Sequence, residues 1–156
     1  MNAAKRAEKA HKVYAIESGT VIDHIPHPMA LKVVEILGVK QDGILTVGMN
    51  FPSQRLGRKD IVKVENLKLT AQVTDRLALV APTATINIIE GSRVVEKRPI
   101  HVPKTFRGLL RCPNPNCITN IESVSTHFVR EGSESEPAVR CTYCERLYRE
   151  PAQLVV

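Results

Sequence analysis

Four cysteines form two short pairs in the C-terminal third of the chain. Cys112 and Cys117 bracket Pro-Asn-Pro-Asn, Cys141 and Cys144 bracket Thr-Tyr, and 23 residues separate the pairs. This spacing is typical of one tetrahedral zinc ion held by four thiolates. Zinc has no redox chemistry here, and four protein ligands leave no open position for water or substrate. The pattern therefore predicts one structural zinc ion per chain, so the function must lie elsewhere.

Two other uses of these cysteines stay open at this point. Two disulfides would require an oxidising compartment, whereas the polar residues 1–12 lack the apolar core of a secretory signal. No stretch approaches the length of a transmembrane span. We therefore expect reduced thiols in the cytoplasm. An iron or iron–sulfur site has compatible spacing and is not distinguished from zinc by sequence alone.

The charge of the chain is unevenly distributed. The formal net charge is +6; residues 1–103 hold 15 Lys/Arg against 10 Asp/Glu, and residues 104–156 hold 7 against 6. A zinc ribbon that binds nucleic acid needs a basic face and stacking aromatics, but aromatics make up 4% of this chain. A nucleic-acid-binding zinc ribbon is thus the rival interpretation, not the favoured one. The excess positive charge lies where it could meet the phosphates of a small ligand.

No catalytic motif accompanies the cysteines. The chain has no G-x-S-x-G, Walker A, G-x-G-x-x-G or H-E-x-x-H sequence. Nothing in these motifs favours catalysis, and a catalytic function stays open as the third interpretation.

Hydrophobic periodicity predicts an α+β chain. Thr70 is a candidate N-cap of the second helix, and Gly38 a stop signal for the first. Strands are expected at 19–25, 44–50, 60–65, 84–89 and 93–97, and helices at 28–37 and 70–80. This β-α-β-β-α-β order with an extra strand is the signature of a ferredoxin-like sheet with helices on one face.

The remaining segments complete the predicted organisation. Residues 1–12 are expected to form a flexible basic tail, 13–103 the ferredoxin-like domain and 104–156 a small zinc-bound β domain. About 50 residues cannot bury a large core, so zinc binding would supply folding free energy to the second domain. Shorter features are expected as follows: a loop at 51–57, a linker at 98–103, and strands near 121–129 and 138–141.

Polar residues recur on the strands of the first predicted sheet. Asp23, His24, Lys63, Asn87 and Lys97 are far apart in sequence, but a sheet can bring such residues to one edge. Lys neutralises phosphate, and Asn and Asp can hydrogen-bond a base or a ribose. The set predicts a nucleotide site, with ordinary surface charge on a sheet as the alternative.

Several local motifs together give a more specific indication. They are Gly19-Thr-Val-Ile-Asp-His-Ile-Pro26, Asn50-Phe-Pro-Ser53, Gly57-Arg-Lys-Asp60 with Lys63-Val-Glu-Asn66, Ala81-Pro-x-Ala-Thr85 with Asn87, and Cys-Pro-Asn-x-Asn-Cys-Ile118. In this order, and with both cysteine pairs, they closely resemble the regulatory chains of aspartate carbamoyltransferase, from about residue 13 to residue 156.

The resemblance implies a non-catalytic, allosteric role in pyrimidine biosynthesis. Members of that family bind CTP and UTP as inhibitors and ATP as activator. They pair as homodimers through their allosteric domains, and their zinc domains contact and bridge catalytic trimers. By position, the resemblance implies a nucleotide site of Ala15, Ile16, Val21, Asp23, His24, Lys63, Asn87, Ile89, Val94 and Lys97. It also implies contacts with the catalytic chain by Asn114, Asn116 and Glu145.

The chain departs from the family pattern at two positions beside the expected site. Tyr14 replaces an acidic residue and Ser92 a tyrosine. These differences leave the ranking of CTP, UTP and ATP open. Lys59 is a candidate for a second nucleotide or a metal-bridged phosphate, and His11 and Lys12 lie in a tail that is slightly longer than in the family.

Overall fold

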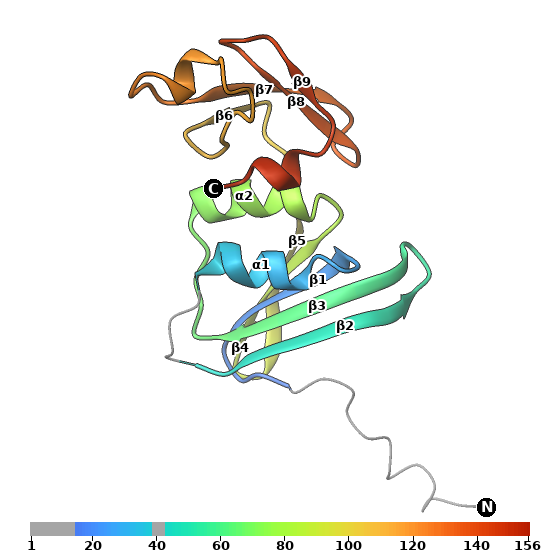
Figure 1. The fold of residues 1–156 in the computed structure, drawn as a ribbon. Helices are drawn as coiled ribbons and strands as arrows, with labels where there is room; N and C mark the ends of the chain where they lie inside the picture. The colour runs from blue at the N-terminus through green and yellow to red at the C-terminus, as the bar shows by residue number, and fades with distance from the viewer. Residues whose placement is uncertain (1–14, 39–42) are drawn as a thin grey trace, which may run out of the picture.

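The computed structural model describes residues 15–38 and 43–156. Tyr14, His11, Lys12 and the predicted tail lie outside these residues. Figure 1 shows a larger sheet with two helices, and a smaller sheet beyond the second helix. The two helices are eight and ten residues long, and no helix in the described ranges is long and apolar enough to cross a membrane.

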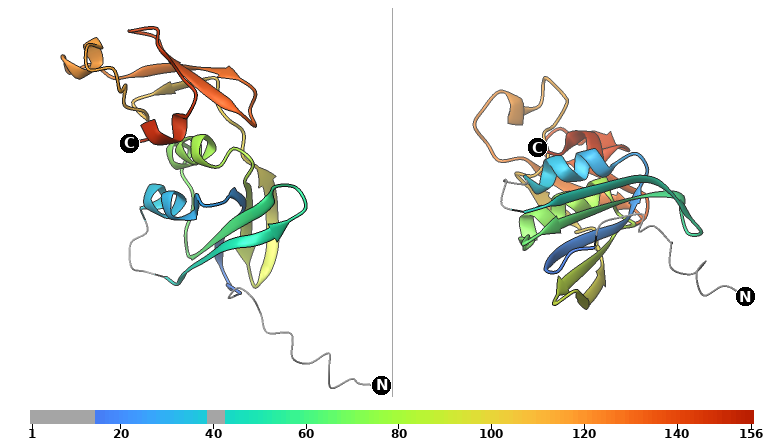
Figure 2. Two further views of the ribbon diagram at one scale, coloured as in Figure 1. Left: turned by 45° about the vertical axis from the view of Figure 1, so that its right-hand side comes forward. Right: turned by 90° about the horizontal axis from the view of Figure 1, so that it is seen from below.

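The larger sheet has five antiparallel strands in the order β2-β3-β1-β4-β5. Its strands are β1 (Gly19–Pro26), β2 (Leu45–Ser53), β3 (Gly57–Glu65), β4 (Thr85–Glu90) and β5 (Arg93–Pro99). The helices are α1 (Ala30–Leu37) and α2 (Ala71–Val80). Both lie on the same side of the sheet (Figure 2). This is the predicted ferredoxin-like order with one added edge strand, and the α+β class is confirmed.

The helix-facing side of the sheet is apolar because side chains alternate along each strand. Ile22 lies opposite Val62 on one neighbouring strand and Ile86 on the other, and all three are at most 1% exposed. Their neighbours in sequence point to the opposite face of the sheet. For convenience we call that second side, which the helices leave uncovered, the open face.

The helix ends follow the sequence signals. Thr70 Oγ1 accepts a hydrogen bond from the Val73 N–H, as an N-cap should, and Gly38 closes α1 in the left-handed conformation (φ 57°). The first helix begins at Ala30 rather than residue 28, because the Met29 N–H bonds to the Pro26 carbonyl in a preceding turn.

The smaller sheet has the strand order β6-β7-β8-β9 and carries the cysteines. Its strands are β6 (Thr105–Arg107), β7 (His127–Gly132), β8 (Pro137–Cys141) and β9 (Leu147–Tyr148), with short 3-10 helices η2 (Ile118–Asn120) and η3 (Pro151–Leu154). Phe106, Phe128 and Val139 are at most 1% exposed and form its apolar centre.

Three local predictions are wrong. A strand over 121–129 begins only at His127, because Ile118–Asn120 form a turn of helix held against the first cysteine pair. The loop expected at 51–57 is mostly strand, since β2 continues past a left-handed Asn50 (φ 65°) to Ser53. The linker expected at 98–103 is packed, with Ile100 and Val102 at most 4% exposed.

Candidate functional site

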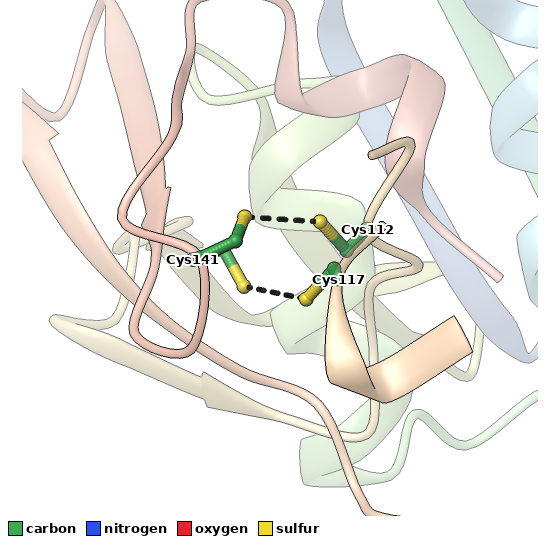
Figure 3. Close-up of side chains that lie close together, drawn as sticks. Cys112, Cys117 and Cys141 are labelled. Atoms are coloured by element: carbon green, nitrogen blue, oxygen red, sulfur yellow. Dashed lines mark hydrogen bonds between the residues drawn. The ribbon is translucent and has the colours of Figure 1, made fainter. Parts of the chain in front are cut away.

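The four cysteine side chains converge on one point. The Sγ atoms of Cys112 and Cys144 lie 3.6 Å apart, those of Cys117 and Cys141 lie 3.8 Å apart, and all four fall within 4.8 Å of one another. Figure 3 shows Cys112, Cys117 and Cys141 turned toward this common centre. A disulfide bond needs about 2.05 Å between sulfurs, so all four cysteines are free thiols.

The arrangement fits a zinc ion. A tetrahedron with Zn–S bonds of about 2.3 Å has sulfur–sulfur edges of about 3.8 Å. The two sulfur–sulfur distances above match that edge. Three of the cysteines are buried and Cys144 is partly buried. The set can hold zinc with no position left for substrate, as expected of a structural site.

The four thiols differ in acidity. Burial raises the pKa of Cys141 to about 12 and raises the pKa of Cys112. Burial opposes ionisation at Cys144 as well, but hydrogen bonds from the Arg146 N–H, the Asn114 side chain and neighbouring thiols outweigh it and lower the pKa of Cys144 to about 6. Four thiolates at this spacing repel one another, so metal binding must displace protons.

Hydrogen bonds between side chains and the backbone shape the first cysteine loop, which contains two of the residues predicted to contact a partner. Asn120 Nδ2 donates to the carbonyls of Cys112 (2.8 Å) and Asn114 (2.7 Å). Asn114 is 7% exposed, and its Oδ1 accepts from the Asn116 N–H at 3.1 Å. Asn116 and Glu145 are exposed, and Glu145 adopts φ 62°. The structure thus places Asn114 inside the loop and the other two on its surface.

The open face brings together residues from all five strands of the larger sheet. Lys63 lies opposite Thr46 and Val21, Val21 opposite Asn87, and Asn87 opposite Lys97. These five positions make one continuous row across β2, β3, β1, β4 and β5. Four of the predicted nucleotide residues therefore share one line and one face.

Asn87 in this row carries an unusual group. Its Oδ1 is buried and has no hydrogen-bond partner within the described part of the chain. A buried carbonyl oxygen without a donor costs about 1–3 kcal/mol. The Asn87 amide is therefore a group that can still accept a hydrogen bond on this face.

Charged groups cluster on one side of the row, further along β1, where Asp23 lies opposite Thr85. Lys59 Nζ lies 2.9 Å from Asp23 Oδ1, and His24 Nδ1 lies 2.9 Å from Thr85 Oγ1. Burial would raise the pKa of Asp23, but hydrogen bonds from Lys59 and the His24 N–H outweigh it and hold that pKa below its usual value. Burial lowers the pKa of His24, Asp23 opposes this, and Lys59, Arg55 and Lys97 add to the lowering. His24 is therefore neutral near pH 7 and surrounded by cations.

The other predicted nucleotide residues lie on the other side of the row, toward the start of β1. Ile89 is opposite both Gly19 and Val94. Ile89 is buried and Val94 is exposed. The N-terminal segment with exposed Ala15 and buried Ile16 is held there by a hydrogen bond from the Ser92 N–H to the Glu17 carbonyl (2.9 Å).

Asp60 is an important residue that the sequence analysis named only as part of a motif. Its side chain is completely buried and accepts three hydrogen bonds: from His27 Nδ1 (2.8 Å), the Asn50 N–H (2.9 Å) and the Ala30 N–H (3.1 Å). It ties the end of β1, the bulge in β2 and the start of α1 to β3. A buried aspartate in a strand was visible in the sequence, but its partners were not.

Comparison with known proteins decides the family. The family model described as the allosteric domain of the aspartate carbamoyltransferase regulatory chain matches residues 11–101, and the model of its metal binding domain matches residues 104–152. The chain belongs to the aspartate carbamoyltransferase regulatory-chain family. The predicted family is thus confirmed.

Individual aspartate carbamoyltransferase regulatory chains align over nearly their full length. The chain is similar to that of Pyrococcus horikoshii, with 53% identity over 142 residues that cover 89% of this chain and 93% of the relative. The regulatory chain of Methanococcus aeolicus is 47% identical, with 86% of each chain covered. That of Korarchaeum cryptofilum is 46% identical, with 88% and 90% covered.

Family membership defines the role at a coarse level. The chain is a regulatory, non-catalytic subunit of a pyrimidine-biosynthesis enzyme, with an allosteric and a metal-binding part. The catalytic chains of aspartate carbamoyltransferase are its implied partners. The cysteine cluster provides the ligands of the metal-binding part, and its geometry fits zinc.

Proposed function

We propose that the open face is the effector site of this regulatory chain and that it binds nucleoside triphosphates, with CTP and UTP inhibiting and ATP activating. The observation that carries the proposal is the row Thr46, Lys63, Val21, Asn87 and Lys97 across all five strands. It combines cations, a buried unpaired carbonyl oxygen and an apolar position on one surface. These groups are complementary to phosphates, to a ribose or base donor, and to the face of a base.

Each part of a nucleotide has a matching group. His24 and Lys97 meet the phosphates, and Lys59 adds charge for a second nucleotide or a metal-bridged phosphate. Asp23 and Lys63 hold the ribose. Backbone groups of Ala15, Ile16 and Ile89 read the base, beside Val21 and Val94. Asn87 Oδ1 accepts a hydrogen bond from a ribose hydroxyl or a base amino group.

The chain is proposed to divide at residues 103 and 104. Residues 13–103 bind the effector and pair with a second copy, and residues 104–156 contact the catalytic chain and so bridge catalytic trimers. Asn116 and Glu145 are exposed beside the cysteines and suited to hydrogen-bond that partner, while Asn114 keeps the loop in shape. The free thiols fit a reducing cytoplasm.

Regulation follows as a coupling free energy between two sites. A nucleotide shifts the assembly toward the quaternary state that it binds better, by no more than its difference in affinity for the two states. A typical coupling of about 1–3 kcal/mol changes substrate affinity roughly 5- to 150-fold. Since α2 contacts η3, a reorientation of the first unit is transmitted to the cysteine-bearing unit.

Calorimetric titration of the zinc-loaded chain with CTP, UTP and ATP tests the proposal. We expect saturable binding that weakens in Lys97→Ala and in Asn87→Ala. Lys104→Ala is the matched control, because Lys104 is exposed and lies in the other unit. Absence of binding by all three nucleotides, or equal weakening in the control, would refute the assignment of the open face. Assembly with catalytic trimers, measured separately by sedimentation, tests the bridging role.

A further inference from the structure

The metal centre has a tyrosine beside it that the function described above does not use. Tyr148 Oη lies 3.4 Å from Cys112 Sγ. Its ring packs against Phe128, with 6.4 Å between ring centroids and 57° between planes. Phe128 is completely buried. The Tyr148 ring, which packs against buried Phe128, therefore directs its hydroxyl at the sulfur of a predicted zinc ligand.

Sheet register fixes the position of this tyrosine. Tyr148 lies on β9 opposite Val139, which is completely buried, and the adjacent Leu147 lies opposite Arg140. The Arg140 guanidinium donates to the Glu145 carbonyl at 2.7 Å and so also secures the loop that contains Cys144. These contacts hold the backbone around Tyr148 independently of its hydroxyl.

A tetrathiolate site has an electrostatic need for such a donor. Four thiolates around one Zn²⁺ leave a net charge of about −2 in a partly buried place. Hydrogen bonds to the sulfurs disperse that charge and are worth more when the acceptor is ionised. Thr119 Oγ1 lies 3.2 Å from Cys117 Sγ and provides one side-chain donor. Tyr148 is placed to provide another at Cys112, because its hydroxyl lies within hydrogen-bond distance of that sulfur.

We propose that Tyr148 is a positioning residue of the metal centre: its hydroxyl donates to the Cys112 thiolate, which orients this ligand, tightens zinc binding and lowers the reactivity of the sulfur. Removing a hydrogen-bond partner of a metal ligand typically weakens metal binding about 10- to 100-fold. Tyr148→Phe should fall at the low end, about 10-fold, because one hydrogen bond of 3.4 Å is lost.

The variant Tyr148→Phe is expected to fold. It keeps the ring against Phe128 and the β8–β9 pairing. A second connection beside Cys112 also persists, because the Arg111 N–H donates to the Leu154 carbonyl at 2.8 Å. An unchanged circular dichroism spectrum at saturating zinc therefore accompanies the expected loss of affinity.

Tyr143→Phe is the matched control. Tyr143 also lies next to a zinc ligand, but it is 47% exposed and its hydroxyl bonds to no residue in the described ranges. Chelator competition on the full-length protein should give about 10-fold weaker zinc binding for Tyr148→Phe and unchanged binding for Tyr143→Phe. Equal zinc affinity of wild type and Tyr148→Phe would overturn the proposal.

Two further measurements separate a hydrogen bond from general packing. In cobalt-substituted protein, the sulfur-to-cobalt charge-transfer band should shift in Tyr148→Phe but not in Tyr143→Phe. Alkylation by iodoacetamide, located by mass spectrometry, should become several-fold faster at Cys112 in Tyr148→Phe, because an unbonded thiolate is the better nucleophile. An unshifted band together with unchanged alkylation at Cys112 would show that the hydroxyl does not act on the sulfur. None of these readouts depends on nucleotide binding.

Discussion

Removing the carboxylate of Asp60 is expected to cost more stability than any other single change of charge in the larger sheet. We consider Asp60→Asn, which keeps the shape of the side chain. The native carboxylate accepts from His27, the Asn50 N–H and the Ala30 N–H, whereas an amide offers one acceptor and one donor group. The new NH₂ must therefore face either the Ala30 N–H or the other two donors.

The magnitude follows from the burial of these groups. Asp60 and Ala30 are 0% exposed, so water cannot replace the lost acceptor for the Ala30 N–H, whereas His27 is 33% exposed and can turn to solvent. A hydrogen bond to a charged group is worth about 1.5–3 kcal/mol, and a buried donor left without its acceptor costs about 1–3 kcal/mol. The start of α1 depends on this contact, since Met29 provides no side-chain cap and Asp60 takes that role from the neighbouring strand. Together these costs give an expected loss of about 3–4 kcal/mol in the free energy of unfolding.

Urea denaturation of the zinc-loaded protein, followed by circular dichroism, measures this loss. Asp75→Asn is the control, because Asp75 has no hydrogen-bond partner in the described ranges and burial raises its pKa. Its ionised form is therefore disfavoured by folding, and neutralising it at pH 7 should be neutral or slightly stabilising. A cost below about 1 kcal/mol for Asp60→Asn would mean that the three hydrogen bonds do not organise the sheet.

Three further predictions address the metal, the effector site and a helix end. Chelation of zinc should unfold the β6–β9 sheet, because zinc binding supplies folding free energy to that sheet, while the larger sheet keeps its circular dichroism signal. Loss of both signals together would contradict this prediction. Nucleotide binding should take up a proton at His24, whose pKa burial and neighbouring cations lower in the free chain. Phosphates would raise this pKa, so affinity should increase as pH falls from about 8 toward 6. Calorimetry in two buffers measures the uptake, and its persistence in His24→Asn would exclude His24 as the source. Thr70→Ala removes the side-chain cap on the Val73 N–H and should lower the free energy of unfolding, measured by urea denaturation, by about 1 kcal/mol. Thr74→Ala is the comparison, because the Thr74 hydroxyl donates to the Thr70 carbonyl and caps no N–H.

Signals that act over a few residues were readable in the sequence. The N-cap Thr70 and the stop at Gly38 depend on neighbouring residues. The two helices and the five strands of the larger sheet are found within a few positions of their predicted ends. The cysteine cluster was readable for the same reason, because the spacing of each pair reflects the geometry of a metal loop.

Contacts between distant segments explain what the sequence did not reveal. The row on the open face depends on the register of five strands, and that register shifts after Ile22 in β1 and after Gly48 in β2. Alternation predicts which residues share a face of one strand, but not which residues meet across strands. Asn114 was predicted at a partner interface, yet a short-range contact with Asn116 and burial at 7% place it inside its loop.

The packing between the larger sheet and the cysteine-bearing sheet determines how a change in one can reach the other. The buried core is continuous from Ile22 in the larger sheet to Phe128 in the smaller one, with Ile100 and Val102 between them. A cleft of about 390 Å³ opens beside this connection, lined by Leu79 of α2, by residues 136–138 and by Arg149 and Pro151. A closely packed core has low compressibility, so it transmits a tilt of one unit to the other unit. This cleft, and a second of about 290 Å³ lined by residues of α1 and α2 and by Val155 and Val156, leave room for such a tilt. If the open face binds the effector as proposed, binding there would change the direction in which the cysteine-bearing unit points while both units keep their own folds.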